Sequence, residues 1–184
     1  MYPIILYGSD KSQEIPIALL TAFHHLNTGV LHLTNRTAAL QPSTPSSVPY
    51  LLIEDGTSYS IQMEHCILIF KDNITNFSQN TLPKACAAIL EADNRTAAAL
   101  LQAHHIPILT CGLSPKNTIT FSSRTPEKAV VTLQREIRTA SGKKIEPCEL
   151  PVSLSKTRAD YAILASIATL WLTDTNFSSK NFEL

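Results

Sequence analysis

Hydrophobic positions in the first part of the chain alternate between short continuous runs and one helical stripe. Residues 4–7 form an apolar run that predicts a strand, and the apolar residues of segment 13–26 fall largely on one helical face. Residues 27–29 predict the end of that helix, with Gly29 in a left-handed conformation, and residues 30–33 predict a second strand. Strand, helix and strand in succession form a βαβ unit, which predicts a parallel sheet with a right-handed crossover.

Continuous apolar runs recur in the middle of the chain and predict strands that are covered on both faces: 49–53, 66–70, 85–90 and 107–111. A helix is expected over residues 95–105, with Asp93 or Asn94 as its N-cap. Segment 41–49 is rich in proline and hydroxyl residues and predicts a mobile loop, and the polar segment 72–81 predicts another.

The pattern changes in the last third of the chain. Three segments that alternate apolar with polar residues predict antiparallel strands, at 118–122, 129–135 and 149–154. Residues 157–173 predict a buried helix, and the polar residues 174–184 predict a frayed tail. The expected fold class is therefore α/β, with a mainly parallel sheet flanked by helices and antiparallel strands near the C-terminus. We expect a single domain over residues 1–173, followed by the tail.

Composition agrees with a globular protein and excludes some functional classes. The chain has 184 residues, of which 44% are hydrophobic and 16% are charged. Fifteen basic and fifteen acidic residues cancel, and without a basic block a nucleic-acid surface has little support. The start does not resemble a signal peptide, and the longest apolar segment, 161–172, is shorter than the roughly 20 residues that a membrane span needs. We therefore expect a cytoplasmic protein without nucleic-acid or membrane partners.

Cysteine and histidine spacing gives little support to a metal site. The four cysteines contain no C-x-x-C pair, and free thiols are favoured over disulfides or metal ligands for Cys66, Cys86, Cys111 and Cys148. The adjacent pairs His24–His25 and His104–His105 end predicted helices, where neighbouring side chains point in different directions.

The loop after the first predicted strand is the first candidate for chemistry. Gly8, Lys11 and Ser12 match parts of the phosphate-binding pattern G-x-x-x-x-G-K-[ST], but the loop is shorter and lacks the second glycine. In a working loop, Lys11 would neutralise phosphate charge and Ser12 would hold Mg²⁺. The alternative is an ordinary turn between a strand and a helix.

Acidic side chains follow two further strands of the expected sheet. Because ligands of open parallel sheets bind outside the carboxyl ends of the strands, Glu54 and Asp55 are candidates to hold Mg²⁺. The alternative is a pair of turn acids before Gly56. Asp93 and Asn94 are expected at the same edge, where a helix-capping role is sufficient to explain both.

Taken in order, these segments resemble the central, ATP-binding domain of the Mur ligases, the bacterial ligases of cell-wall precursors. Residues 4–12 resemble the family's strand and G-T-x-G-K-T loop, and residues 52–58 resemble the segment in which a glutamate binds Mg²⁺. Residues 90–94 resemble the N-A-D-D strand end, residues 108–113 the I-T-Y-G-L strand, and residues 161–168 the N-A-L-A-A-I-A helix. The resemblance extends over residues 2–172.

The resemblance implies ATP and Mg²⁺ as cofactors. It places Gly8, Lys11 and Ser12 on phosphate and Asp93 and Asn94 near the nucleotide, with Glu54 as the metal ligand. The sequence also departs from the family. Residues 153–157 replace the G-x-H-N segment, and residues 71–75 replace a histidine-containing stretch. The chain has no room for the family's N-terminal UDP-substrate domain or its C-terminal domain.

Three functional hypotheses follow from this resemblance. The preferred one is a degenerate Mur-ligase-like domain that does not catalyse ligation alone and retains weak nucleotide or anion binding, or has a partner or regulatory role. The second is an ATP- and Mg²⁺-dependent enzyme that is completed by a partner protein. The third is a structural or interaction domain without a ligand.

Overall fold

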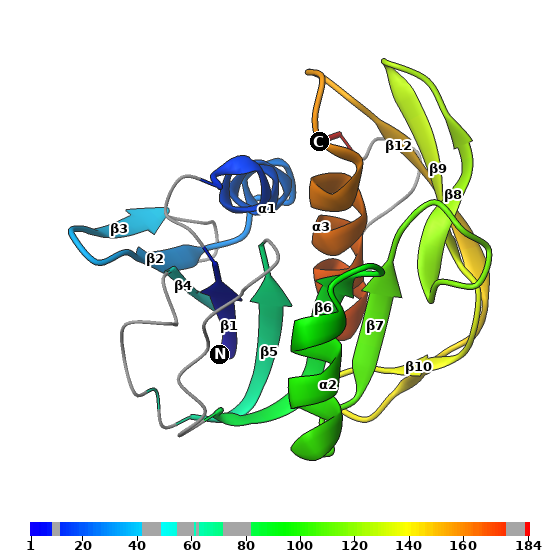
Figure 1. Ribbon diagram of the computed structural model, residues 1–184. Helices are drawn as coiled ribbons and strands as arrows, with labels where there is room; N and C mark the ends of the chain where they lie inside the picture. The colour runs from blue at the N-terminus through cyan, green and yellow to red at the C-terminus, as the bar shows by residue number, and fades with distance from the viewer. Residues whose placement is uncertain (9–11, 42–48, 55–60, 62, 72–81, 176–182) are drawn as a thin grey trace.

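A ten-stranded mixed sheet forms the centre of the molecule (Figure 1). The computed structural model describes residues 1–8, 12–41, 49–54, 61, 63–71, 82–175 and 183–184. The strands of the sheet are, in chain order, β1 (Tyr2–Tyr7), β2 (Val30–Leu33), β3 (Ala38–Gln41), β4 (Tyr50–Glu54), β5 (Glu64–Phe70), β6 (Lys84–Glu91), β7 (Ile108–Cys111), β8 (Ile119–Arg124), β9 (Lys128–Leu133) and β12 (Cys148–Ser153). The short strands β10 (Ile137–Arg138) and β11 (Lys144–Ile145) form a separate antiparallel pair.

The strand order confirms the predicted fold class. It runs β12-β9-β8-β7-β6-β5-β1-β4-β2-β3, and the strands from β2 to β8 in this order pair in parallel. β8, β9 and β12 form the expected antiparallel extension. β3 pairs antiparallel with β2 at the other edge of the sheet. Neither β3 nor the β10–β11 pair was predicted.

In the described part of the chain, three helices cover the sheet: α1 (Glu14–His25), α2 (Arg95–Ala103) and α3 (Asp160–Leu172). α1 and α3 lie side by side on one face and contact each other, while α2 lies on the opposite face (Figure 1). α3 is buried along almost its whole length because it packs against α1 and against strands β5 to β8, in agreement with its continuous apolar sequence. Among the described residues, no helix is both long and apolar enough to cross a membrane.

The alternation of side chains along β1 separates two hydrophobic cores. Because successive side chains of a strand point to opposite faces, Ile4 and Leu6 pack in the core beneath α1 and α3. Ile5 and Tyr7 pack in the core beneath α2. A central strand with both faces covered needs apolar residues at every position, and this need explains the continuous run in the sequence.

Two local predictions are wrong, and both have a physical reason. The left-handed residue after α1 is Asn27, with φ of 50°, and not Gly29, because the helix end already closes two residues earlier, where the backbone N–H groups of Asn27 and Thr28 donate to the carbonyl oxygens of His24 and Phe23. The tail does not fray at its end: the side chain of Leu184 is buried, and its backbone N–H donates to the carbonyl oxygen of Ser153 at 2.9 Å. Of the predicted loops at 41–49 and 72–81, residues 42–48 and 72–81 lie outside the described residues.

Candidate functional site

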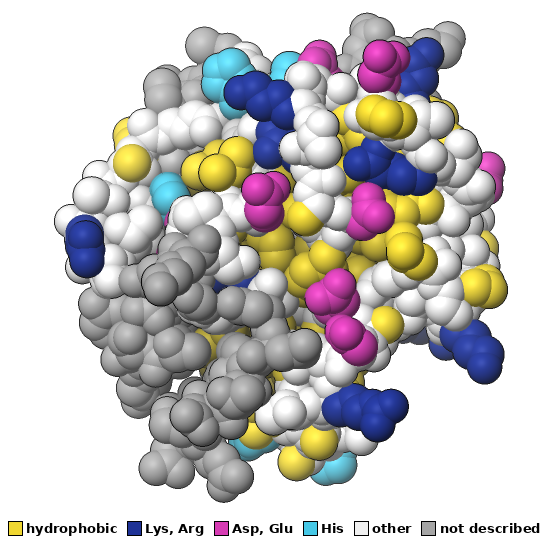
Figure 2. All heavy atoms as spheres, turned by 45° about the horizontal axis from the view of Figure 1, so that its top comes forward, with side chains coloured by type: hydrophobic (Ala, Val, Ile, Leu, Met, Phe, Trp, Pro, Cys, Tyr) yellow, Lys and Arg dark blue, Asp and Glu magenta, His cyan; other side chains and the backbone are white. Residues whose placement is uncertain are grey.

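A cavity of about 570 Å³ opens at the carboxyl ends of the parallel strands, where α1 and α3 begin. Its walls are the residues after β6 and β7 and the first turns of the two helices. Figure 2 views the molecule from this end and shows acidic side chains around an exposed hydrophobic area. This is the edge at which open parallel sheets bind their ligands, and the volume suits a small molecule.

Beside the cavity, side chains from β2 and from the end of β5, which lies beyond β1, converge on the carboxylate of Glu54 in β4. Glu54 ends β4, His32 lies in β2 next to it, and Lys71 follows β5 directly. By the alternation of strand side chains, each points to the face that α1 and α3 cover: Glu54 follows Leu52 by two residues, and Lys71 follows Ile69 by two. The same alternation therefore brings the imidazole of His32, the carboxylate of Glu54 and the ammonium group of Lys71 together.

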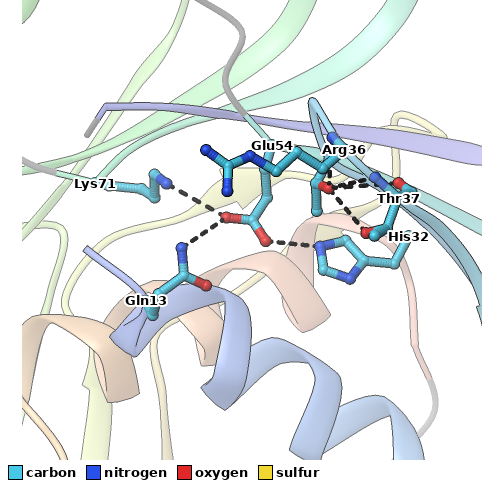
Figure 3. A network of polar contacts seen from close by, with 7 residues as sticks. Gln13, His32, Arg36, Thr37, Glu54 and Lys71 are labelled. Carbon is cyan, nitrogen blue, oxygen red and sulfur yellow. Dashed lines mark hydrogen bonds and ion pairs between the residues drawn. The ribbon is translucent and has the colours of Figure 1, made fainter. Parts of the chain in front are cut away.

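The contacts of Glu54 account for both of its carboxylate oxygens (Figure 3). His32 Nε2 lies 2.7 Å from Oε1, and Lys71 Nζ lies 3.4 Å from Oε2. The amide of Gln13, directly before α1, donates to Oε2 at 3.4 Å. The side chain of Lys71 is 0% exposed and that of Glu54 is 6% exposed, so water cannot replace these partners readily.

The environment holds Glu54 in its charged form. Burial alone raises the pKa of this carboxyl group, but the hydrogen bond with His32 and the charge of Lys71 outweigh it, and the net pKa is below the usual value. The carboxylate is thus neutralised from within the protein. An ammonium group beside Oε2 repels a second cation, so the arrangement does not fit Glu54 as a ligand of Mg²⁺.

The other predicted nucleotide-binding residues lie in different surroundings. Gly8 directly follows β1 and has a φ of 143°, in the region that favours glycine, and Lys11 lies outside the described residues. Ser12 and Asp93 line the cavity. Asn94 is buried, and its side chain accepts a hydrogen bond from the backbone N–H of Ala97 at 3.1 Å, which is the capping geometry predicted for α2.

Negative charge dominates the lining of the cavity. Glu14, Glu91, Asp93 and Asp160 contribute carboxylates, and Asp160 is paired with Arg124 Nε at 3.0 Å. Among the described residues of the lining, Lys71 is the single lysine or arginine, and its charge is already opposed by Glu54. Burial, and then the charge of Asp93, raise the pKa of Glu91.

Sequence reasoning missed three partners of Glu54 because none belongs to a motif. Gln13, His32 and Lys71 are separated from Glu54 by 41, 22 and 17 positions. A signal for Lys71 was present, since it continues the two-residue alternation of the buried strand β5.

The cysteines are free, although Cys148 is exposed. The rings of His24 and His25 are perpendicular, at 89°, and no group of three His, Cys, Asp or Glu residues in the described part of the chain could hold a metal ion.

Comparison with known proteins supports the fold class and leaves the activity open. No protein-family model matches the sequence, and no curated protein does. Among solved structures, the chain is similar to a UDP-N-acetylmuramoyl-L-alanyl-D-glutamate–2,6-diaminopimelate ligase, with a TM-score of 0.56 and 9% sequence identity. The match covers 98% of this chain and 44% of that one. The chain thus has a fold like that of part of a Mur ligase, over less than half of that ligase's length.

Proposed function

We propose that this protein is a Mur-ligase-like domain that does not catalyse ligation by itself and acts as a binding or regulatory module. The observation that carries the proposal is the ion pair of Glu54 with the buried ammonium group of Lys71, beside the hydrogen bonds of the same carboxylate with His32 and Gln13. In the resemblance to the Mur ligases, Glu54 stands where a metal ligand is expected, and here a buried ammonium group supplies the positive charge.

The charge of the cavity supports the same proposal. A ligase that activates a carboxylate with ATP must hold a polyphosphate, which carries several negative charges. The N-termini of α1 and α3 would suit an anion, but Glu14 and Asp160 occupy their first turns. Together with Glu91 and Asp93, these carboxylates repel phosphate.

Thermal unfolding with and without Mg-ATP tests the proposal. A ligand at 100 times its Kd stabilises the folded state by about 2.7 kcal/mol, so a working site would raise the melting temperature measurably. We expect no shift at millimolar Mg-ATP and no release of phosphate by the isolated protein. A shift that Ser12→Ala abolishes, while the exposed-surface variant Glu146→Gln retains it, would show that the nucleotide site works and would contradict the proposal.

A second candidate is an ATP- and Mg²⁺-dependent enzyme that a partner protein completes. The position of the cavity favours it, because Ser12 and Asp93 both line the opening at the carboxyl ends of the strands. Under this alternative, ATP is hydrolysed only after a partner is added, and Asp93→Asn reduces that turnover. Partner-dependent turnover in the wild-type protein therefore separates this candidate from the first.

A further inference from the structure

We propose that Arg158 binds the carboxylate group of a small molecule, at the point where the segment before α3 contacts α1. Arg158 directly precedes Ala159, the N-cap of α3, and its guanidinium group reaches Thr21 in the second half of α1. Arg158 is not among the described residues that line the cavity. The inference therefore goes beyond the proposed function and does not depend on what the cavity binds.

Arg158 is a charged residue that the protein buries without an acidic partner. It is 8% exposed, and an arginine side chain carries a full positive charge at physiological pH. In the described part of the chain no ion pair includes Arg158, whereas Arg124 is paired with Asp160 at 3.0 Å. A buried charge that nothing opposes destabilises the folded state, because it has lost hydration and gained no attraction in return. The missing opposite charge is the first indication of an anionic ligand.

The hydrogen bonds of the guanidinium group are incomplete as well. Nη2 donates to Thr21 Oγ1 at 3.0 Å, but Nε is buried and has no hydrogen-bond partner. The Thr21 hydroxyl donates to the carbonyl oxygen of Ile17 at 2.7 Å, so it offers Arg158 a neutral acceptor and no negative charge. A buried N–H group without an acceptor is rare in folded proteins and costs free energy. The unused donor is the second indication, and it points to a ligand with acceptor atoms.

The arrangement of the two donors defines the chemical class of the ligand. Nε and Nη2 lie on one edge of the planar guanidinium group, and two parallel N–H groups match the two oxygens of a carboxylate. A carboxylate carries one negative charge and compensates the single charge of Arg158, whereas a phosphate dianion would leave one charge buried without compensation. Thr21 is only half-buried, so rotation of its side chain can open this edge to a small ligand. The site thus favours a small monocarboxylate over a phosphate, a metal ion or an amine.

The effect of removing the guanidinium group separates a ligand site from a structural contact. Methionine has a similar length and no charge, so Arg158→Met removes the buried charge together with the hydrogen bond to Thr21. If a ligand supplies the missing charge, this variant in chloride alone should be at least as stable as the wild-type protein, because no opposite charge is left behind. If Arg158 only holds α1 and the segment before α3 together, the same variant should be less stable.

Thermal unfolding at constant ionic strength, with acetate exchanged for chloride, tests the inference. We expect the melting temperature of the wild-type protein to rise saturably with acetate and not with acetamide, a neutral probe of the same shape. Arg158→Met should remove the acetate-dependent rise. Arg158→Lys, which keeps the charge without the paired N–H groups, should increase the half-saturating acetate concentration at least about tenfold. Arg135→Met, which changes an exposed arginine, is the matched control and should retain the response.

Three outcomes would overturn the inference. The first is no saturable response of the cooperatively unfolding wild-type protein to millimolar acetate, or an equal response to acetamide. The second is an acetate response that Arg158→Met retains, or that Arg135→Met loses to the same extent, since either would indicate a general salt effect. The third is a lower melting temperature of Arg158→Met than of the wild-type protein in chloride, because Arg158 would then stabilise the fold without a ligand. A shift with Mg-ATP that depends on Ser12 would contradict the proposed function alone, so the two failures are distinguishable.

Discussion

Lys71 and Glu54 form an ion pair that is almost completely removed from water, with side-chain exposures of 0% and 6%. Such a pair does not by itself make a protein more stable than apolar residues would, because both charges lose their hydration. Its effect appears when one partner is removed, since the other charge is then buried without compensation. A substitution of Lys71 or of Glu54 alone is therefore expected to destabilise the protein more than a substitution of both.

A double-mutant cycle measures that dependence. Lys71→Met and Glu54→Gln should each lower the free energy of unfolding by about 3 kcal/mol, because each removes one charge of the buried pair and leaves the other without it. The double variant should be more stable than the sum of the two losses indicates, by at least about 1 kcal/mol. Urea unfolding of the four proteins gives the result. Additive losses would mean that the two side chains do not interact.

The lowered pKa of Glu54 predicts a loss of stability in acid. The unfolded state protonates this group near the ordinary pKa of 4.5, and the folded state protonates it only at lower pH. Folding therefore releases a proton between these values, so the contribution to stability is complete above pH 4.5 and is lost as the pH falls through the folded pKa. The groups that face the carboxyl are His32, Lys71 and Gln13.

The difference in unfolding free energy between the wild-type protein and Glu54→Gln should shrink as the pH is lowered from 6 to 3, since the wild-type carboxylate becomes protonated and loses its advantage. Glu146→Gln, which changes an exposed acid, serves as the control. A constant difference between the wild-type protein and Glu54→Gln over this range would contradict the account of the Glu54 environment.

At the scale of the elements, Asn94 is the N-cap of α2, and its contribution to stability can be measured. Its side chain caps α2 through the N–H of Ala97. Asn94→Ala should lower the stability by about 1 kcal/mol and Asn94→Asp should restore it, because aspartate also caps helices. Asp93→Ala, one residue earlier, should change the stability by less than about 0.5 kcal/mol. Thermal unfolding compares the three variants, and equal effects of Asp93→Ala and Asn94→Ala would exclude a specific cap.

Most of the large elements could be predicted because burial leaves a strong pattern in the sequence. β1 and the inner parts of β5 and β6 are covered on both faces and carry continuous apolar runs, and α3 is buried on nearly all sides. β3 could not be found in this way, since its residues are mostly exposed and its pairing with β2 leaves no apolar pattern in the sequence. The two-residue strands β10 and β11 are too short to carry any periodicity.

The end of the chain provides a second prediction at this scale. Leu184 is buried in the core beneath α1 and α3 and pairs with Ser153 through its backbone. Leu184→Ala should lower the free energy of unfolding by about 2 kcal/mol, which is at the small end of the range for a buried leucine. Unfolding in urea measures it. A change of a few tenths of a kcal/mol would indicate that the end of the chain is frayed, as its polar sequence suggested.

At the scale of the whole molecule, the fold class followed from the order of the segments, but the site did not. The position of Ser12 and Asp93 at one opening follows from the rule for carboxyl ends of parallel strands. The partners of Glu54 follow from strand order: β2 and β1 flank β4, and β5 lies beyond β1. That order depends on pairing between distant segments, which no local pattern encodes. The sequence therefore indicated Glu54 as a candidate site residue. It did not indicate His32 and Lys71, which lower the pKa of Glu54.

The central claim is that Lys71 supplies the positive charge at Glu54 that a divalent ion would otherwise provide. Titration with Mn²⁺, followed by electron paramagnetic resonance of the free ion, tests it most directly. We predict that the wild-type protein and Glu54→Gln give the same titration curve at micromolar to millimolar Mn²⁺. Stoichiometric binding of Mn²⁺ by the wild-type protein that Glu54→Gln abolishes and Glu146→Gln retains would contradict the claim.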